Sequence, residues 1–197
     1  MARPTLTKEQ VTAFRRRARF AALALFEEHD DVTLRALAKA LGCSHATPYR
    51  YFESKEALFM AVRAEAFERF GAYLTARLEG VHDPIARIQL IASGYFAFAQ
   101  DETGAFRVMF ELGQPRHDAY PEHRPSSLGA WSIVEDAVRY AVERNVLVGD
   151  VSTLAHLFWS AVHGITTLHL AQRLSLGREG DSLIRPMVDS LLEAHRP

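Results

Sequence analysis

The segment SHATPYRYFESK, residues 44–55, concentrates hydroxyl, imidazole, guanidinium and ammonium groups in twelve positions. Hydroxyls and helix N-terminal amides bind phosphate oxygens, and a lysine adds a positive point charge. An arginine can hold a guanine edge through two parallel hydrogen bonds, and a threonine or alanine methyl can contact thymine. These residue types therefore suit a surface that holds phosphates and reads bases.

Two short helices are expected to position these groups. The apolar residues of 34–41 recur at helical spacing, and Thr33 before them is a good N-cap. Gly42 breaks the helix, and Ser44 can cap a second one. Two short helices joined by a glycine-containing turn form a helix-turn-helix, whose second helix enters the DNA major groove. The alternative is a plain helical hairpin with a polar outer face.

The flanking residues favour the first interpretation, because residues 14–60 resemble the N-terminal DNA-binding domain of the TetR family of bacterial transcriptional regulators. The matching positions are an alanine-rich helix ending in Leu25 and Phe26, followed by Thr33, Gly42, Ser44, Tyr49, Phe52, Lys55 and Leu58. The resemblance covers under a third of the chain. It implies a helix-turn-helix DNA-binding domain over residues 1–53 and an effector-binding and dimerisation domain over residues 54–197.

DNA contacts follow residue by residue. Thr33 and Ser44 stand at expected helix starts, where phosphate binds, and the family uses the residues matching Tyr49 and Lys55 on phosphates as well. Residues 44–55 are called the recognition segment here; His45, Ala46, Thr47 and Arg50 within it are candidates to face bases, whereas Phe52 is expected in the core. The candidate DNA-binding residues are Thr33, Ser44, His45, Ala46, Thr47, Tyr49, Arg50, Tyr51 and Lys55.

Pro48 departs from the family pattern, which has an aliphatic residue before the tyrosine. Proline lacks an N–H and disfavours helical geometry in the residue before it, but it is tolerated at the first helical position. Two starts of the recognition helix therefore stay open, one after Ser44 and one after Thr47. The later start would weaken base contacts by His45 and Ala46.

Charge is divided unevenly along the chain. Residues 1–55 hold ten Lys or Arg and six Asp or Glu, a net charge of +4, and residues 56–197 hold thirteen and eighteen, a net charge of −5. The basic end coincides with the segment that resembles a DNA reader, as phosphate binding requires. A single cysteine excludes a disulfide framework. The sequence shows no signal-peptide pattern and no run of 18 apolar residues, so we expect a cytoplasmic protein without a membrane anchor.

The rest of the chain reads as helices, which makes the predicted fold all-α. Long helices are expected over 54–78, 84–99, 126–146, 150–174 and 181–194, a shorter one from Asp101 or Thr103 to Leu112, and a loop over 113–125. Nine helices result, three of them in the N-terminal domain. Helix 54–78 is expected to be the only element that joins the two domains.

Trp159, His163 and Gly164 resemble the Trp-His-Gly subgroup of TetR-like C-terminal domains. Trp159 and His163 share a helix face, and Gly164 could permit a close helix crossing. His163 is interpreted either as a core residue bonded to a carbonyl or hydroxyl, or as an effector contact. The resemblance implies a mostly apolar cavity for a small hydrophobic effector. The candidate effector-binding residues are Phe67, Phe70, Tyr95, Met109, Phe110, Trp131, Trp159 and His163. His156 and His163 share a helix face but His169 does not, so no metal is expected, and no cofactor is expected because the sequence has no cofactor fingerprint.

Apolar stripes run along helices 150–174 and 181–194. Both could be ordinary core, but a reader of two-fold DNA needs a two-fold interface, and the family builds it from these helices. The sequence thus predicts a homodimeric repressor that an effector releases from a pseudo-palindromic operator. A TetR-like activator is the first alternative. A small helical enzyme or ligand carrier is the second, although no nucleophile elbow, phosphate loop or metalloprotease motif is present.

Overall fold

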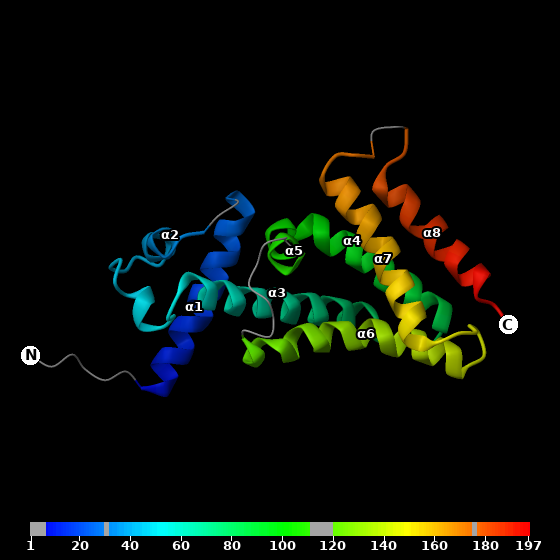
Figure 1. The fold of residues 1–197 in the computed structure, drawn as a ribbon, viewed down its shortest axis with the longest axis horizontal. Helices are drawn as coiled ribbons and strands as arrows, with labels where there is room; N and C mark the ends of the chain where they lie inside the picture. The colour runs from blue at the N-terminus through cyan, green and yellow to red at the C-terminus, as the bar shows by residue number, and fades with distance from the viewer. Residues whose placement is uncertain (1–6, 30–31, 111–119, 175–176) are drawn as a thin grey trace, which may run out of the picture. The chain divides into compact units, whose positions relative to one another are not determined.

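The computed structural model describes residues 7–29, 32–110, 120–174 and 177–197 of the chain. These residues form eight α-helices and two short 3₁₀ turns and contain no strand, which confirms the expected all-α fold (Figure 1). The chain divides into two compact units. Unit 1 comprises residues 1–67 and 102–126, and unit 2 comprises residues 68–101 and 127–197.

Unit 1 is built around α1 (Lys8–Glu28), which packs on α2 (Leu34–Ala40) and on α5 (Thr103–Phe110). The 3₁₀ turn η1 (Pro48–Arg50) lies against α2, and α3 (Lys55–Arg77) begins in this unit. The apolar sides of these helices close a small core, to which Leu23, Leu37 and Met60 contribute buried side chains.

Unit 2 contains the second half of α3 and four further helices. These are α4 (Pro84–Asp101), α6 (Arg124–Glu143, from Ser127 onward), α7 (Val151–Leu170) and α8 (Gly180–Ala194). α8 packs on both α4 and α7, and α4 packs on α7. In Figure 1 α7 and α8 lie side by side and run in opposite directions.

Four helices begin at side-chain caps, close to their predicted starts. The side-chain oxygens of Thr33, Ser54, Asp83 and Asp150 accept hydrogen bonds from the backbone N–H three residues onward, at 2.7–3.1 Å. Each satisfies a donor that the first helical turn leaves without a partner. α1 adds a complete capping box between Thr7 and Gln10.

Two predicted boundaries are wrong. The predicted loop 113–125 falls partly on residues outside the described ranges, but η3 (Pro121–His123) and the start of α6 at Arg124 make its end helical. Pro125 stands in the first turn of α6, where a missing N–H costs nothing. α7 ends at Leu170 with Ala171 as its C-cap, short of the predicted residue 174.

Close helix approaches occur at glycines other than Gly164. A Cβ at Gly94 would lie 3.0 Å from atoms of Leu74 and Arg77, and one at Gly180 would lie 2.8 Å from the Phe96 ring. A Cβ at Gly164 would meet no atom of the described chain within 4 Å. The expected crossing at Gly164 is therefore not made within the chain itself.

The contact between α1 and α5 also corrects the expectation that helix 54–78 alone joins residues 1–53 to the rest. At the α5 N-terminus, the Gly104 N–H donates to Glu27 Oε2 on α1 at 2.7 Å. Glu27 thus acts as a cap supplied by another helix, since a carboxylate stabilises the positive end of the helix dipole. α5 follows α4 after a single intervening residue, so α4 and α3 both lead into unit 1.

Replacing Gly104 by alanine is expected to destabilise the protein by about 1–3 kcal/mol, because the added Cβ would lie 2.7 Å from the Glu27 backbone nitrogen. Gly129→Ala on α6 is the matched control, since a Cβ there meets nothing within 4 Å. The control should gain up to about 1 kcal/mol from the higher helix propensity of alanine. Urea unfolding monitored by circular dichroism measures both changes, and equal effects would contradict the tight contact.

Candidate nucleic-acid interface and ligand pocket

α2 ends in a Schellman motif that turns the chain toward the recognition segment. Gly42 has φ +64°, a left-handed conformation that favours glycine. The Gly42 N–H donates to the Lys39 carbonyl at 3.1 Å, and the Cys43 N–H donates to the Ala38 carbonyl at 3.0 Å. The helix-turn-helix geometry predicted around Gly42 therefore has a specific backbone basis.

The second element is a pair of tight turns rather than an α-helix. The Thr47 N–H donates to the Ser44 carbonyl, and η1 follows from Pro48 to Arg50. The start after Thr47 is thus the one the chain adopts, because Pro48 has no N–H with which to continue a helix from Ser44. Neither predicted cap forms at this point: Thr47 makes no side-chain cap bond, and its hydroxyl lies 2.9 Å from that of Ser44.

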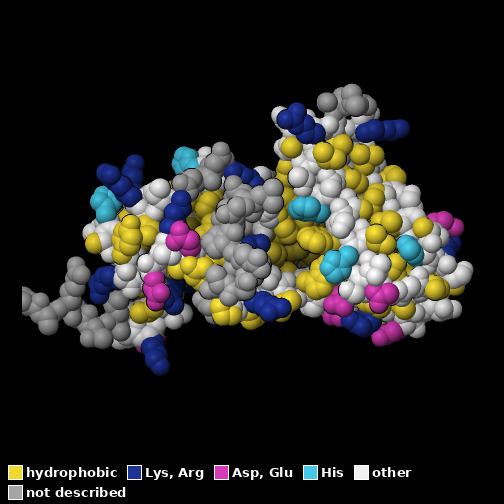
Figure 2. Space-filling view, viewed as in Figure 1, with side chains coloured by type: hydrophobic (Ala, Val, Ile, Leu, Met, Phe, Trp, Pro, Cys, Tyr) yellow, Lys and Arg dark blue, Asp and Glu magenta, His cyan; other side chains and the backbone are white. Residues whose placement is uncertain are grey.

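Most of the candidate DNA-binding side chains face solvent. Tyr49 is 63% exposed and projects from η1, while Thr47 is half-buried. The other exposed candidates are Thr33, Ser44, His45, Ala46, Arg50 and Lys55. Figure 2 shows Lys and Arg side chains distributed over unit 1. The structure therefore leaves these side chains accessible to an anionic ligand.

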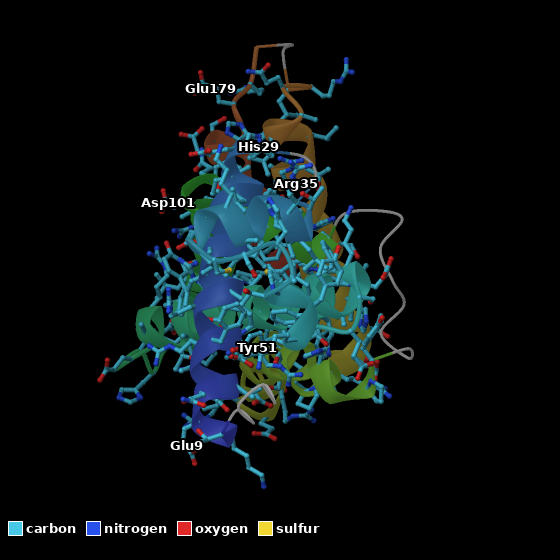
Figure 3. The ribbon with its side chains drawn as sticks, turned by 90° about the vertical axis from the view of Figure 1, so that its left-hand side faces the viewer. Glu9, His29, Arg35, Tyr51, Asp101 and Glu179 are labelled. Carbon is cyan, nitrogen blue, oxygen red and sulfur yellow. The ribbon has the colours of Figure 1, made fainter. Side chains whose placement is uncertain are left out.

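Tyr51 is the exception among these candidates. Its ring is 8% exposed and stacks on Phe14 of α1, with centroids 3.8 Å apart and an interplanar angle of 17°. Its carbonyl accepts a hydrogen bond from Arg15 Nε at 3.0 Å, and Figure 3 shows it beside α1. This burial removes Tyr51 from the predicted DNA contacts and makes it, with the buried Phe52, part of the unit 1 core.

The arginines of α1 divide into two kinds. Arg15 bonds to Tyr51, and Arg19 Nε lies 3.1 Å from Glu65 Oε2, an ion pair without hydrogen-bond alignment. Arg16 and Arg17 are exposed. On α2, Arg35 is exposed two residues after the Thr33 cap, as Figure 3 shows. Arg35 was not among the predicted DNA contacts, although its place in the first turn of α2 was the available signal.

Unit 2 holds an apolar pocket between α4, α6 and α7. The space open to the centres of water molecules is only about 20 Å³, enough for about one water. A ligand larger than water must therefore displace lining side chains. The lining residues are Ile88, Ile91, Ala92, Tyr95, Val134, Ala137, Val138, Phe158, Trp159 and Val162.

The few polar atoms of the pocket meet at Tyr95. The Tyr95 hydroxyl lies 2.8 Å from His163 Nδ1, and Trp159 also forms a side-chain hydrogen bond to Tyr95. Burial raises the pKa of Tyr95, and the bond from Trp159 opposes this. Burial lowers the pKa of His163. Tyr95 and His163 are therefore both neutral near pH 7.

The candidate effector residues fall into two groups. Tyr95 and Trp159 line the pocket, and His163 lies behind Tyr95. Trp131 packs on Trp159 with centroids 5.8 Å apart, and Phe70 packs on Tyr95 at 5.4 Å. The other three candidates belong to unit 1: Phe67 packs on Phe110 at 5.9 Å, and Met109 is fully buried there. Most of the lining is aliphatic and was not selected from the sequence.

The neutral state of His163 predicts a pH dependence of stability. Since its folded pKa lies below its unfolded value, the unfolded chain binds more protons as the pH falls through the unfolded pKa, and stability is lost there. We expect the free energy of unfolding to fall between about pH 7 and pH 5. His163→Gln should remove part of this dependence, whereas His156→Gln, at an exposed position of the same helix, should not. Identical pH profiles for both variants would contradict the assignment.

α7 and α8 present apolar residues outward as well as inward. On α7, Leu157 and Leu168 are 42% and 46% exposed, and Ala161, Gly164 and Ile165 between them are half-buried. On α8 the outward residues Leu183, Met187 and Leu191 are half-buried, whereas Ile184, Val188 and Leu192 are buried in unit 2. Each predicted stripe therefore consists of two apolar faces of the helix. One face is buried within unit 2, and the other is exposed or half-buried.

Within the described ranges, neither a metal-binding group nor a membrane-spanning helix is present. No group of three or more His, Cys, Asp or Glu side chains there is arranged to hold a metal ion. None of the helices in the same ranges combines the length and the hydropathy that crossing a membrane requires.

Two family models match the chain. Residues 20–62 match the model described as bacterial regulatory proteins, tetR family, and residues 88–191 match the tetracyclin repressor-like C-terminal domain. The second match alone covers more than half of the chain. The first covers the helix-turn-helix, and the second covers the pocket and the outward faces of α7 and α8.

Individual proteins also resemble this chain, in sequence or in fold. An uncharacterised HTH-type transcriptional regulator of Mycobacterium tuberculosis, present in two strains, is 39% identical over 70 residues, 34% of this chain and 35% of the relative. The match thus spans about a third of the relative's length. A protein of unknown function from Rhodococcus sp. RHA1 has the same fold, with a TM-score of 0.82, 24% identity and coverage of 93% and 95%.

The fold also recurs in a regulator solved with a ligand. The transcriptional regulator FadR from Bacillus subtilis, in complex with stearoyl-CoA, gives a TM-score of 0.73 at 16% identity, over 89% of this chain and 96% of that one. At this identity the likeness concerns the fold alone. With the two family matches and the helix-turn-helix geometry, the chain belongs to the TetR family of bacterial transcriptional regulators, a family of regulators rather than enzymes.

Proposed function

We propose that this regulator is a homodimeric, cytoplasmic repressor that binds a pseudo-palindromic operator and is released from it by a small apolar effector. The observation that carries the proposal is the presence, in one chain, of an exposed helix-turn-helix and an apolar pocket walled by α4, the helix that leads into α5. Residues 1–53 would bind DNA, and residues 54–197 would bind the effector and dimerise.

The DNA-binding role rests on the exposed groups of the recognition segment. Ser44, Tyr49 and Lys55 offer hydroxyls and a cation to phosphates, and Thr33 adds a hydroxyl at the start of α2. Arg50, exposed at the end of η1, is the best candidate to grip a guanine edge. The two turns project His45 and Ala46 before η1, so these can reach bases only if the turn itself enters the groove.

The dimer rests on the outward faces of α7 and α8. Leu157 and Leu168 of α7 are large exposed apolar side chains, which mark an interaction surface, and α8 adds the half-buried Leu183, Met187 and Leu191. A second copy would cover both faces symmetrically, forming a four-helix bundle in which Gly164 permits close approach. Such a dimer places two recognition segments on one DNA, as a palindrome with half-sites about 34–36 Å apart requires.

Effector action rests on the covalent and packing route from the pocket to α1. Because the pocket has room for only about one water molecule, a larger ligand must displace lining side chains of α4, α6 or α7. α4 leads through Glu102 into α5, whose N-terminus is held by Glu27 of α1. Movement of α4 would thus reach α1 and the helix-turn-helix. Release requires the ligand to prefer the conformation that does not bind DNA.

The testing experiment selects bound duplexes from random DNA with the purified protein and then measures affinity for the selected sequence at 50 and 300 mM salt. We expect a palindromic consensus and an affinity that falls steeply with salt, because several phosphates are contacted. Equal affinity at both salt concentrations, or no enriched sequence, would overturn the proposal.

An activator with the same parts is the alternative. A reporter gene behind the selected operator separates the two. Deleting the regulator raises expression if it represses and lowers expression if it activates.

A further inference from the structure

The polar side-chain atoms at the pocket in unit 2 are hydrogen-bonded to one another. The Trp159 indole N–H is a donor only, so in its hydrogen bond with Tyr95 the phenol oxygen is the acceptor. The hydroxyl hydrogen of Tyr95 then points to His163 Nδ1, 2.8 Å away. Nδ1 accepts, which leaves the imidazole proton on Nε2, 3.4 Å from Thr167 Oγ1. The three side chains form one closed chain of hydrogen bonds.

The remainder of the lining offers neither charge nor polarity. Apart from Tyr95 and Trp159, every lining side chain is a hydrocarbon, and no Lys, Arg, Asp or Glu is among them. His163 stands behind Tyr95 as a neutral ring. A hydroxyl or carboxylate carried into this pocket would leave water without gaining a partner, which is costly for the hydroxyl and far more so for the charge.

We infer that the pocket selects a hydrocarbon: it takes an uncharged aromatic or aliphatic skeleton and rejects the same skeleton with a hydroxyl or carboxylate at its buried end. That this ligand is an effector rests on the proposed function. The selectivity itself is a property of the pocket and can be measured without DNA.

Three probes with one skeleton test the selectivity: toluene, 4-methylphenol and 4-methylbenzoate. Titration calorimetry on the full-length protein should give toluene an affinity about 10- to 100-fold above that of 4-methylphenol, since a site without a free partner discriminates against an added hydroxyl by about that factor. 4-Methylbenzoate should not bind measurably. Equal or tighter binding of either polar probe, or no binding of toluene up to its solubility, would overturn the inference.

Tyr95→Phe tests the internal pairing directly. Loss of the phenol oxygen exposes the Trp159 N–H and His163 Nδ1 to the pocket, so 4-methylphenol should gain on toluene by about tenfold or more. Tyr73→Phe is the matched control, because Tyr73 lies on α3 outside the pocket lining. An unchanged probe ratio in Tyr95→Phe would refute the pairing.

Trp159→Phe provides a second variant if Tyr95→Phe does not fold. It removes the donor to Tyr95, so the phenol oxygen can accept from a ligand hydroxyl, and the ratio should again shift toward 4-methylphenol. An operator-release assay is run separately. Selective toluene binding without release of DNA would reject the effector role and keep the selectivity. Release of DNA by the polar probes would reject the selectivity and keep the effector role.

Discussion

Replacing Leu168 by glutamate is expected to convert the proposed dimer into monomers and to lower affinity for a two-half-site operator by at least about 100-fold. Leu168 is 46% exposed on the outward face of α7, where a second copy would bury the new charge without a partner. A monomer holds one half-site only, and the avidity gained from linking two binding events is commonly 10²–10⁴-fold. Analytical ultracentrifugation and binding to the selected operator measure the two effects.

Leu128→Glu is the matched control, because Leu128 is 51% exposed on α6 and lies outside both outward faces. It should leave assembly and DNA affinity unchanged. Leu192 does not serve this test, since it is buried in unit 2 and a charge there would unfold the unit. A Leu168→Glu variant that remains a dimer with full operator affinity would place the interface elsewhere.

The apolar stripes of α7 and α8 show why sequence alone could not decide between a core role and an interface role for these helices. Spacing correctly put apolar residues on α7 and α8, but Leu154 and Phe158 face inward whereas Leu157 and Leu168 face outward. A wide apolar stripe is typical both of a buried helix and of a helix with one face inside and one at an interface. Only the packing of α8 on α4 and α7 separates the two faces.

The helix caps and the helix break around the recognition segment were predictable from sequence, but the form of its second element was predictable only in part. The caps at Thr33 and Ser54 and the break at Gly42 follow from residue type alone. Pro48 signalled a late start of the second element. That the element would shrink to a single 3₁₀ turn depends on how Pro48 and Tyr51 pack into unit 1, which is a tertiary effect.

The candidate effector residues were less predictable from sequence than the helix caps. Aromatic content pointed to Tyr95 and Trp159, which do line the pocket. The same criterion selected Phe67 and Phe110, which pack on one another in unit 1. An aromatic side chain fills a core as readily as it lines a cavity, so composition cannot separate these roles. The aliphatic lining carries no distinguishing signal in the sequence.

Arg50→Ala and Lys55→Ala are expected to damage DNA binding in different ways. Arg50, exposed at the end of η1, should read a base, so its loss should cost about 1–3 kcal/mol at the best site and relax the preference at one base-pair position. Lys55 begins α3, where the helix dipole disfavours a cation and a phosphate would compensate. Its loss should weaken all sequences about equally and reduce the salt slope by about one.

The comparison requires affinities of each variant for the consensus, for single-base-pair changes and for random DNA, over a range of salt. Arg178→Ala is the control, because Arg178 is an exposed arginine of unit 2; it removes one positive charge without touching the helix-turn-helix. If Arg50→Ala weakens every sequence equally and lowers the salt slope, Arg50 is a phosphate contact. The base specificity would then come from the turn at residues 44–47, which would have to enter the groove so that the exposed His45 and Ala46 contact bases.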